Sequence, residues 1–537
     1  MADYDAIIVG AGHNGLTAGT VLAKAGLRVL ILERTGWIGG MAATKELFPG
    51  FKHNVGAWAL LVLHEDMERL LELQKYGLDI ITPPTSYCVF GAPGDAPFIW
   101  HNDPAQMLAH LMNDHGPDAV QGVMGLWEYL QVFGKVMDAY RFKAPESIES
   151  LIAAAPDART RETLITCFYG SAMEVIRKFF PDPNKHRCIQ GSVAAMSIDG
   201  THMGPYSAGS ACSMAYHYTV SGGANVFKMP KGGIGSVSDA ILKSFAEHGG
   251  KVQFRADVAR FLVEGGAVVG VQLRSGETIS TRVVLSSLDA RGTFIDLTGE
   301  EQLPSDFVHA VKEIEYRNGY IQIHVTLKEL PEFTGHLAFI NENNIRWLPS
   351  YIPSPEHLAR CWEQYRRNQV PDDPVSYCYI PSVMDPSLAP SGYYTCTLFS
   401  HYFPAELSPA EHDKQKHVMA DRVIGQMAKY APNFRGAIMD QAIFTHEYFR
   451  AKFGITAGDF SHGLLHPGQM WNRRPVPGYS DYRTPIKHLY LCGSGCHPGP
   501  GLTCLPGYNS AQRVLQDLAQ ARPSASPRAA KAVALGV

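Results

Sequence analysis

The chain has 537 residues, of which 45% are hydrophobic and 18% are charged, and its formal net charge is -4 at pH 7. This length allows two or three domains with a large core, and the composition is ordinary for a soluble globular protein. The slight acidity and the lack of basic runs give no electrostatic reason to expect nucleic-acid binding. No stretch of about 20 apolar residues is free of charge or glycine, so we expect no membrane span and leave only peripheral membrane contact open.

The cysteine pattern and the N-terminus favour a cytoplasmic protein. The ten cysteines show no framework of the secreted type, which indicates a reducing compartment. Nothing resembles a cleavable signal peptide, because the first predicted strand begins within a few residues of Met1. Cys492, Cys496 and Cys504 lie in a run rich in Gly and Pro, where small side chains allow close backbone approach, so we expect no metal site.

A strand, a glycine-rich turn, a helix and a second strand are predicted in chain order at the N-terminus. The apolar run Ala6–Val9 predicts the first strand, and the segment from about Asn14 to Ala25 predicts the helix. The segment Arg28–Leu32 predicts the second strand, which ends on Glu33. This order is that of a βαβ unit.

Three glycines of this unit fit the pattern G-x-G-x-x-G: Gly10, Gly12 and Gly15. The pattern indicates dinucleotide binding when it lies between the strand and the helix of a βαβ unit, as it does here. The first allows a tight turn, the second lets the backbone approach a pyrophosphate, and the third lets the helix pack on the sheet. The helix N-terminus then offers free N–H groups to the phosphate. Glu33 can accept hydrogen bonds from a ribose 2′-OH, which favours an adenine dinucleotide without a 2′-phosphate.

The following segment, ERTGWIGGMAAT, resembles flavoproteins of the amine-oxidase and phytoene-desaturase type, in which a glycine pair and a threonine follow the βαβ unit. Gly39, Gly40 and Thr44 match that pattern. The resemblance implies that the dinucleotide is FAD and that Arg34, Gly39, Gly40 and Met41 lie beside it. Many members carry an arginine where this chain has Met41, so one phosphate contact is lost and backbone N–H groups must replace it.

Beyond this block the segment FPGFKHNVGAWALLV, from Phe48 to Val62, predicts a turn followed by an apolar stretch. The resemblance implies that Gly56 and Trp58 lie at the cofactor, with Trp58 lining the flavin face. The section from about Ala105 to Phe180 is mostly helical and amphipathic, which is more typical of a domain cap than of a cofactor site.

The segment Lys228–Ala290 predicts a helix that begins after the glycines at 232–235 and ends at Gly249-Gly250, followed by a strand and two hairpins. The last of these hairpins leads into the apolar strand RVVLSS. The segment resembles the returning half of the FAD domain, in which Val258 matches the position whose backbone brackets the adenine. The glycines at 232–235 lack a clear preceding parallel strand, so we do not expect a second, NADPH-binding unit there.

A third block, LCGSGCHPGPGLTCLPGYN, lies near the C-terminus. A predicted strand at Leu489–Cys492 leads into it, and a helix begins near Pro506, whose N-terminus would stabilise negative charge on a reduced flavin. The three blocks together resemble the phytoene desaturase-like branch, including members named after pyridine nucleotide-disulphide oxidoreductases. That resemblance implies FAD contacts from Gly493, Leu505 and Pro506.

These patterns predict an α/β fold: a discontinuous Rossmann-like FAD-binding domain, an α+β substrate-binding domain with strands such as GYIQIHVTL and GYYTCTLFS, and a helical section. The final segment, 521–537, is rich in Pro, Ala and Ser, which is typical of disorder. No pattern indicates an oligomeric state. The FAD-binding domain is expected at 1–64, 222–300 and 480–520, and the substrate-binding domain at 65–221 and 301–479.

The missing motifs narrow the reaction class. A disulphide reductase of this fold would need a redox cysteine pair soon after the first glycine motif, and no cysteine lies between Gly40 and Cys88. Because no NADPH unit is expected, electrons should leave to oxygen or a quinone. We expect a desaturase or dehydrogenase that takes a hydride from a small, largely apolar substrate, cyclic or carbonyl-bearing. A flavin amine oxidase, a redox-neutral isomerase and a non-catalytic FAD-bearing carrier remain alternatives.

Two histidines are candidate catalytic residues. Hydride transfer depends chiefly on holding a C–H bond over the flavin, so a dedicated acid or base can be absent. Where a carbonyl lies beside that bond, a base must take the neighbouring proton, and histidine suits neutral pH. Of 22 histidines we single out His497, in the loop expected beside the flavin, and His217, in a segment resembling one that feeds the substrate cavity.

Overall fold

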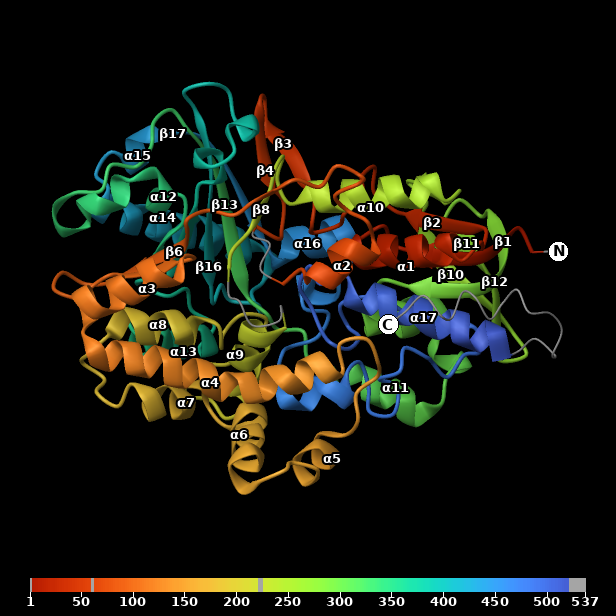
Figure 1. Cartoon of the computed structure of the whole chain (residues 1–537). Coiled ribbons are helices and arrows are strands. Elements are labelled where there is room, and N and C mark those ends of the chain that lie inside the picture. The colour runs from red at the N-terminus through yellow and green to blue at the C-terminus, as the bar shows by residue number, and fades with distance from the viewer. Residues whose placement is uncertain (1, 59–61, 221–225, 521–537) are drawn as a thin grey trace.

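The structure is a computed structural model that describes residues 2–58, 62–220 and 226–520. Two seven-stranded sheets organise these residues. Figure 1 shows the sheet that contains the N-terminal strand on the right, and the second sheet on the left above a layer of helices. The tail for which disorder is predicted, 521–537, lies outside the described residues.

The first sheet is built around the predicted N-terminal βαβ unit. It comprises β1 (Tyr4–Val9), β2 (Val29–Glu33), β9 (Lys251–Phe254), β10 (Val258–Glu264), β11 (Ala267–Leu273), β12 (Thr278–Ser286) and β18 (Leu489–Leu491). The strand order is β10-β11-β12-β1-β2-β9, and β18 pairs with β12. The pairs of β1 with β2 and β12, of β2 with β9 and of β12 with β18 are parallel, whereas β10 and β11 form an antiparallel extension.

Both faces of the parallel part are buried, as the apolar sequence of its strands requires. Ile8 packs in one hydrophobic cluster and Ile7 in another, because successive side chains of a strand point to opposite faces. Three helices cover the Ile8 side: α1 (His13–Lys24), α10 (Gly235–Glu247) and α17 (Leu505–Gln520). The predicted βαβ unit, the helix after the glycines at 232–235, the two hairpins and the C-terminal strand and helix are confirmed.

The second sheet has the order β17-β13-β16-β15-β14-β6-β7. Its strands are β6 (Thr85–Phe90), β7 (Phe98–His101), β13 (Tyr320–Leu327), β14 (Pro349–Tyr351), β15 (Ser376–Tyr379), β16 (Tyr394–His401) and β17 (Ile438–Thr445). Ile323 and Leu398 point to one face and pack in an apolar core. Gln322, Phe399 and Tyr377 form a direct cross-strand row on β13, β16 and β15, and all three line a cavity.

The helical section predicted from about Ala105 to Phe180 belongs to a layer of helices that continues to Thr219, and four of these helices have a capped N-terminus. The side chains of Asp103, Ser147, Asp157 and Ser171 each accept a hydrogen bond from the backbone N–H three residues later, which satisfies a group that the helix itself leaves unpaired. The helices of this layer are α3 (Pro104–His110), α4 (Pro117–Ala139), α5 (Ile148–Ala153), α6 (Ala158–Tyr169), α7 (Ala172–Phe179), α8 (Arg187–Ala195) and α9 (Ser210–Thr219).

Two small sheets and seven further α-helices lie in the described part of the chain, in which no helix is both long and apolar enough to cross a membrane. Two small sheets pair β3 (Thr44–Phe48) with β4 (Phe51–Asn54), and β5 (Ile80–Ile81) with β8 (Met229–Pro230). The remaining helices are α2 (Glu65–Leu70), α11 (Ser305–Lys312), α12 (Asn343–Arg346), α13 (Pro355–Arg366), α14 (Pro409–Tyr430), α15 (Phe434–Ala437) and α16 (His446–Phe453).

The contact between α1 and the first turn tolerates no side chain at Gly15. A Cβ there would lie 2.0 Å from the carbonyl oxygen of Gly10. We expect Gly15→Ala to lower the free energy of unfolding by about 3 kcal/mol, because backbone must move to relieve the overlap. Gly436→Ala is the control, since a Cβ there meets no atom within 4 Å. Equal melting temperatures of the two variants would contradict this account.

Candidate active site and cofactor site

One cavity of about 410 Å³ is lined by residues from both sheets. One part of its lining comes from the loops that follow β1, β2 and β12, at the carboxyl ends of parallel strands. Ligands of open α/β sheets bind at such strand ends. The other part comes from the second sheet and from the helical layer. The cavity therefore joins a dinucleotide-type site to a second compartment.

The turn between β1 and α1 leaves its backbone open to the cavity. Gly10 has a φ of 99°, a conformation that glycine adopts without strain. A Cβ on Gly12 would meet no atom closer than the Ser287 Oγ, at 3.9 Å, so space lies beside this backbone. α1 begins without a side-chain cap, which leaves its first N–H groups for an anion. This arrangement fits a pyrophosphate.

Glu33 ends β2 inside the cavity lining and is 6% exposed. Its Oε2 accepts a hydrogen bond from the Ala11 N–H at 2.9 Å, and its Oε1 accepts one from the Thr35 N–H at 2.8 Å. Each carboxylate oxygen keeps a second lone pair, because a carboxylate can accept about four hydrogen bonds. Glu33 thus fixes the turn and can still accept from ribose hydroxyls.

Most residues predicted to contact the cofactor line this cavity. Four do not: Gly15, Gly493, Leu505 and Pro506 lie behind the lining, and a Cβ on Gly493 would come within 2.5 Å of the Ser287 carbonyl oxygen. Close packing against backbone explains why Gly15 and Gly493 are glycines. Direct contact of these four residues with FAD stays a prediction. The predicted residues in the lining are Gly10, Gly12, Glu33, Arg34, Gly39, Gly40, Met41, Gly56, Trp58 and Val258.

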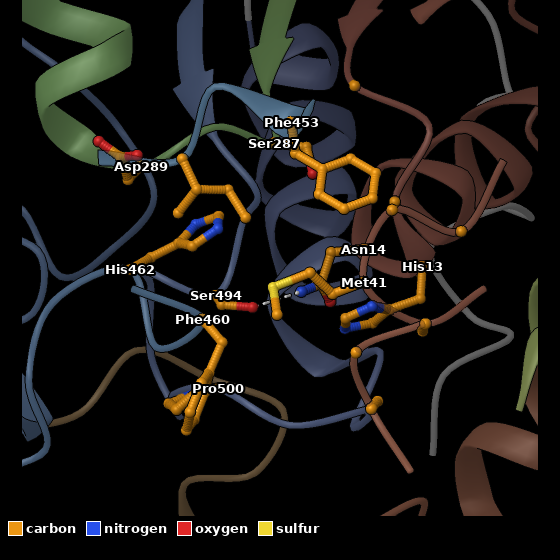
Figure 2. Close-up of a pocket in the computed structure, with 18 of the residues that line it drawn as sticks. His13, Asn14, Met41, Ser287, Asp289, Phe453, Phe460, His462, Ser494 and Pro500 are labelled. Atoms are coloured by element: carbon orange, nitrogen blue, oxygen red, sulfur yellow. Dashed lines mark hydrogen bonds between the residues drawn. The ribbon is translucent and has the colours of Figure 1, made fainter. Parts of the chain in front are cut away.

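The C-terminal block joins the start of α1 through several polar contacts. The Asn14 Nδ2 donates to the Ser494 Oγ at 3.5 Å, which Figure 2 shows as a dashed line, and the His13 Nε2 donates to the Gly501 carbonyl oxygen at 3.1 Å. These four residues line the cavity, and sequence reasoning did not assign them. The only local signal was their place inside two glycine-rich blocks.

The structure does not support the predicted catalytic role of His497. Its side chain is absent from the cavity lining and 1% exposed. The Nε2 donates to the Tyr140 carbonyl oxygen at 3.0 Å, and the ring packs edge-on against Trp471 at 5.1 Å. The loop therefore turns this imidazole towards the helical layer. Burial lowers the pKa of His497 to about 4, so the ring is neutral at pH 7.

Another histidine of the same region does line the cavity. His462 lies beside Asp289 in Figure 2, and both residues belong to the lining. Burial lowers the pKa of His462, and the nearby Asp289 carboxylate offsets part of that effect. The chain separates these two residues by more than 170 positions, so no spacing in the sequence connects them.

Aromatic side chains form the wall of the second compartment. Trp58 stacks on Phe227 with ring centroids 5.8 Å apart, and it lies 5.8 Å from Tyr377 and 6.3 Å from Phe399. All four line the cavity. Tyr377 and Phe399 are directly opposite on β15 and β16, so the register of the second sheet brings them together. The compartment can bury a flat or cyclic apolar molecule.

One ion pair interrupts this apolar wall. His217 on α9 was predicted as a candidate, and it lines the cavity together with Asp199 from the loop before that helix. The His217 Nε2 lies 3.2 Å from the Asp199 Oδ2, and its Nδ1 lies 2.9 Å from the Ser213 carbonyl oxygen. A carbonyl and a carboxylate only accept hydrogen bonds, so this geometry suits a doubly protonated imidazole.

The titration behaviour of this group agrees with that geometry. Burial by itself lowers the pKa of His217, but the hydrogen bond and the charge of Asp199 more than offset it and raise the pKa above 6.5. Burial raises the pKa of Asp199, and the His217 partner more than offsets this and lowers it. His401 lines the same cavity, and burial lowers its pKa to about 4. One histidine is therefore charged and the other neutral at pH 6.

A glycine cradle at the carboxyl ends of parallel strands, a helix N-terminus and a buried acid at the end of the second strand define a dinucleotide-binding fold. Comparison with known proteins identifies the family. The model of the flavin containing amine oxidoreductase family matches residues 15–515.

Curated relatives align along nearly the whole chain. "Pyridine nucleotide-disulfide oxidoreductase domain-containing protein 2" of Rattus norvegicus is 29% identical, over 96% of this chain and 94% of its own. The chloroplastic prolycopene isomerase of Daucus carota is 25% identical, and the alignment covers 96% of this chain and 80% of the isomerase. A limonene dehydrogenase subunit of Castellaniella defragrans is 24% identical, and the alignment covers 96% of this chain and 95% of that subunit.

Solved structures share the fold. An oxidoreductase from Methanosarcina mazei has a TM-score of 0.61 at 16% identity, with 95% of this chain and 100% of that chain covered. Putrescine oxidase bound to putrescine has a TM-score of 0.61 at 15% identity, with 96% and 99% covered. The chain belongs to the flavin containing amine oxidoreductase family and is an FAD-dependent oxidoreductase.

The cradle geometry makes FAD retention sensitive to Gly12 and Glu33. We expect Gly12→Val to purify without the yellow colour, because its side chain would occupy the space beside the turn. Glu33→Gln should retain FAD with roughly tenfold weaker affinity, since a neutral amide replaces a charged acceptor. Absorbance of flavin released by denaturation measures both. Retention by Gly12→Val equal to that of the wild type would contradict the assigned pyrophosphate site.

The ion pair of His217 and Asp199 should make stability depend on pH. A raised pKa of His217 contributes stability that is complete below pH 6.5 and is lost as the pH rises through the folded-state pKa. We therefore expect His217→Gln to lower the melting temperature by roughly 2–4 °C more at pH 6 than at pH 9. Thermal unfolding across that range checks this. A difference between the two proteins that does not change with pH would exclude a charged His217.

Proposed function

We propose that this protein removes two hydrogens from a largely apolar, cyclic molecule and converts a C–C bond to C=C. The observation that carries the proposal is the aromatic compartment that opens directly off the cofactor part of the cavity. The name of one relative, a limonene dehydrogenase subunit, describes dehydrogenation. Electrons then leave to oxygen or a quinone.

The compartment supplies positioning more than chemistry. Trp58 and Phe227 offer a flat face, and Tyr377 and Phe399 offer a second wall against which a ring can pack. Such packing expels water and holds a C–H bond in one orientation, which contributes much of the rate in a reaction of this kind. When bound, FAD supplies the hydride acceptor.

The proton that must also leave the substrate has a candidate acceptor in the lining. His401 lines the cavity, and burial lowers its pKa to about 4, which keeps it neutral at pH 7. A neutral imidazole can take a proton from a bound molecule. The charged His217 lacks that capacity while it stays protonated. Catalysis by the cluster is thus assigned to His401, with His217 and Asp199 as its charged neighbours.

Amine oxidation is the second candidate function. Aromatic rings together with a carboxylate can bind an ammonium group, and Trp58, Tyr377 and Asp199 all line the compartment. Putrescine oxidase and cyclohexylamine oxidase share the fold. Against this candidate, the charge of Asp199 is already balanced by His217 at 3.2 Å.

Product analysis separates these reactions. The purified enzyme is incubated aerobically with a metabolite extract and with a set of cyclic hydrocarbons, ketones, alcohols and amines. We expect products that have lost two hydrogens with carbon and nitrogen unchanged, detected by mass spectrometry. Loss of an amino group as ammonia would establish amine oxidation instead, and an unchanged mass with a shifted retention time would establish isomerisation. Anaerobic repetition with an added quinone distinguishes the two electron acceptors.

A matched pair of variants tests the compartment. We expect Trp58→Leu to raise KM about tenfold or more, because it removes a large stacking surface from the cavity. Met439→Leu, a change at an exposed residue of β17 that is absent from the lining, is the control. Unchanged kinetics of Trp58→Leu would contradict the placement of the substrate in this compartment.

A further inference from the structure

In the substrate compartment, Asp199 is more available to hydrogen-bond a ligand than His217 is. Both nitrogens of His217 are engaged, one by the Ser213 carbonyl oxygen and one by the Asp199 Oδ2. Asp199 has a second carboxylate oxygen, and 34% of its side-chain surface is exposed, compared with 10% for His217. Because both residues line the cavity, the group that a bound molecule meets is the carboxylate.

A second acceptor lies in the same lining. The Gln322 Nε2 donates to the Gly56 carbonyl oxygen at 2.8 Å, which fixes the orientation of the amide. The Gln322 Oε1 is buried and has no hydrogen-bond donor in the described part of the chain. A buried acceptor without a donor is costly in free energy unless a ligand or water supplies one. The Asp199 carboxylate and the Gln322 Oε1 are thus two acceptors of the lining that a ligand with a donor group can satisfy.

We propose that the substrate carries an uncharged hydroxyl group, which donates a hydrogen bond to the Asp199 carboxylate. This inference rests on the proposed function and narrows its substrate class to hydroxylated, largely apolar cyclic molecules. His217 is the positioning residue: it fixes the carboxylate through the Oδ2 and leaves the other oxygen for the ligand.

The charge balance selects a hydroxyl over an ammonium group. Both nitrogens of His217 lie against acceptors, 3.2 Å from the Asp199 Oδ2 and 2.9 Å from the Ser213 carbonyl oxygen, which suits an imidazolium that neutralises Asp199. An ammonium ion would then add an uncompensated positive charge to a buried site. A hydroxyl donor adds none. A ketone of the same shape offers only an acceptor, so it cannot donate a hydrogen bond to the Asp199 carboxylate.

Three ligands with one carbon skeleton test the proposal: 4-phenylcyclohexanol, 4-phenylcyclohexanone and 4-phenylcyclohexylamine. Binding to the holoenzyme is measured by anaerobic calorimetry at pH 7.5 after reduction of the flavin, so that no oxidation occurs. We expect the better isomer of the alcohol to bind at least tenfold more tightly than the ketone or the amine. Equal or tighter binding of the ketone or the amine by the wild type would overturn the proposal.

Variants locate the effect. We expect Asp199→Leu to reduce the preference for the alcohol over the ketone to less than twofold. His202→Gln is the matched control, because His202 lies on the same loop but faces a separate pocket with Glu315. It should leave the preference unchanged. A preference that survives in Asp199→Leu, or that is lost equally in His202→Gln, would also overturn the proposal, and bound-flavin absorbance confirms that each variant is folded.

The outcome is distinguishable from failure of the proposed function, because binding is measured without turnover. Products that have lost two hydrogens, together with no preference for the alcohol, would support the desaturation and contradict the hydroxyl contact with Asp199. A preference for the alcohol, together with ammonia release from amines, would support the hydroxyl contact and contradict the desaturation.

Discussion

The close approach of α1 to the backbone around it is the constraint on which the site depends. A Cβ on Gly15 would lie 2.0 Å from the Gly10 carbonyl oxygen, and one on Gly507 would lie 2.1 Å from the Asn14 carbonyl oxygen. Glycine at both positions lets the β1 turn, α1 and α17 meet without intervening side chains. The cradle for the pyrophosphate and the wall formed by the C-terminal block are consequences of that contact.

The second sheet adds the substrate compartment through its register. Gln322, Phe399 and Tyr377 lie in one row because β13, β16 and β15 pair at those residues, and the alternation of side chains turns the row towards the cavity. The opposite face of the same strands packs in an apolar core. A shift of one residue in either pairing would move this row to the core, so the core fixes the compartment.

Burial gives the histidines of the site different charges. His401 is held neutral by burial, whereas Asp199 holds His217 charged although it is as deeply buried. The contact between His217 and Asp199 at 3.2 Å is the largest cause that raises the pKa of His217. The compartment is therefore apolar along its rings and carries a carboxylate at one point, which can orient a substrate that is otherwise held by packing.

The sequence by itself determined the α/β class, the N-terminal βαβ unit and the family resemblance, because the glycines at 10, 12 and 15 and the acid at 33 act within a short segment. It also singled out His217, but not Asp199 or His401, which are brought to it from a loop and from the second sheet. The tertiary structure alone decided that His497 faces Tyr140 and not the cavity. Local patterns specify turns and helix starts, whereas the partners of a side chain depend on packing between segments far apart in the chain, which no spacing encodes.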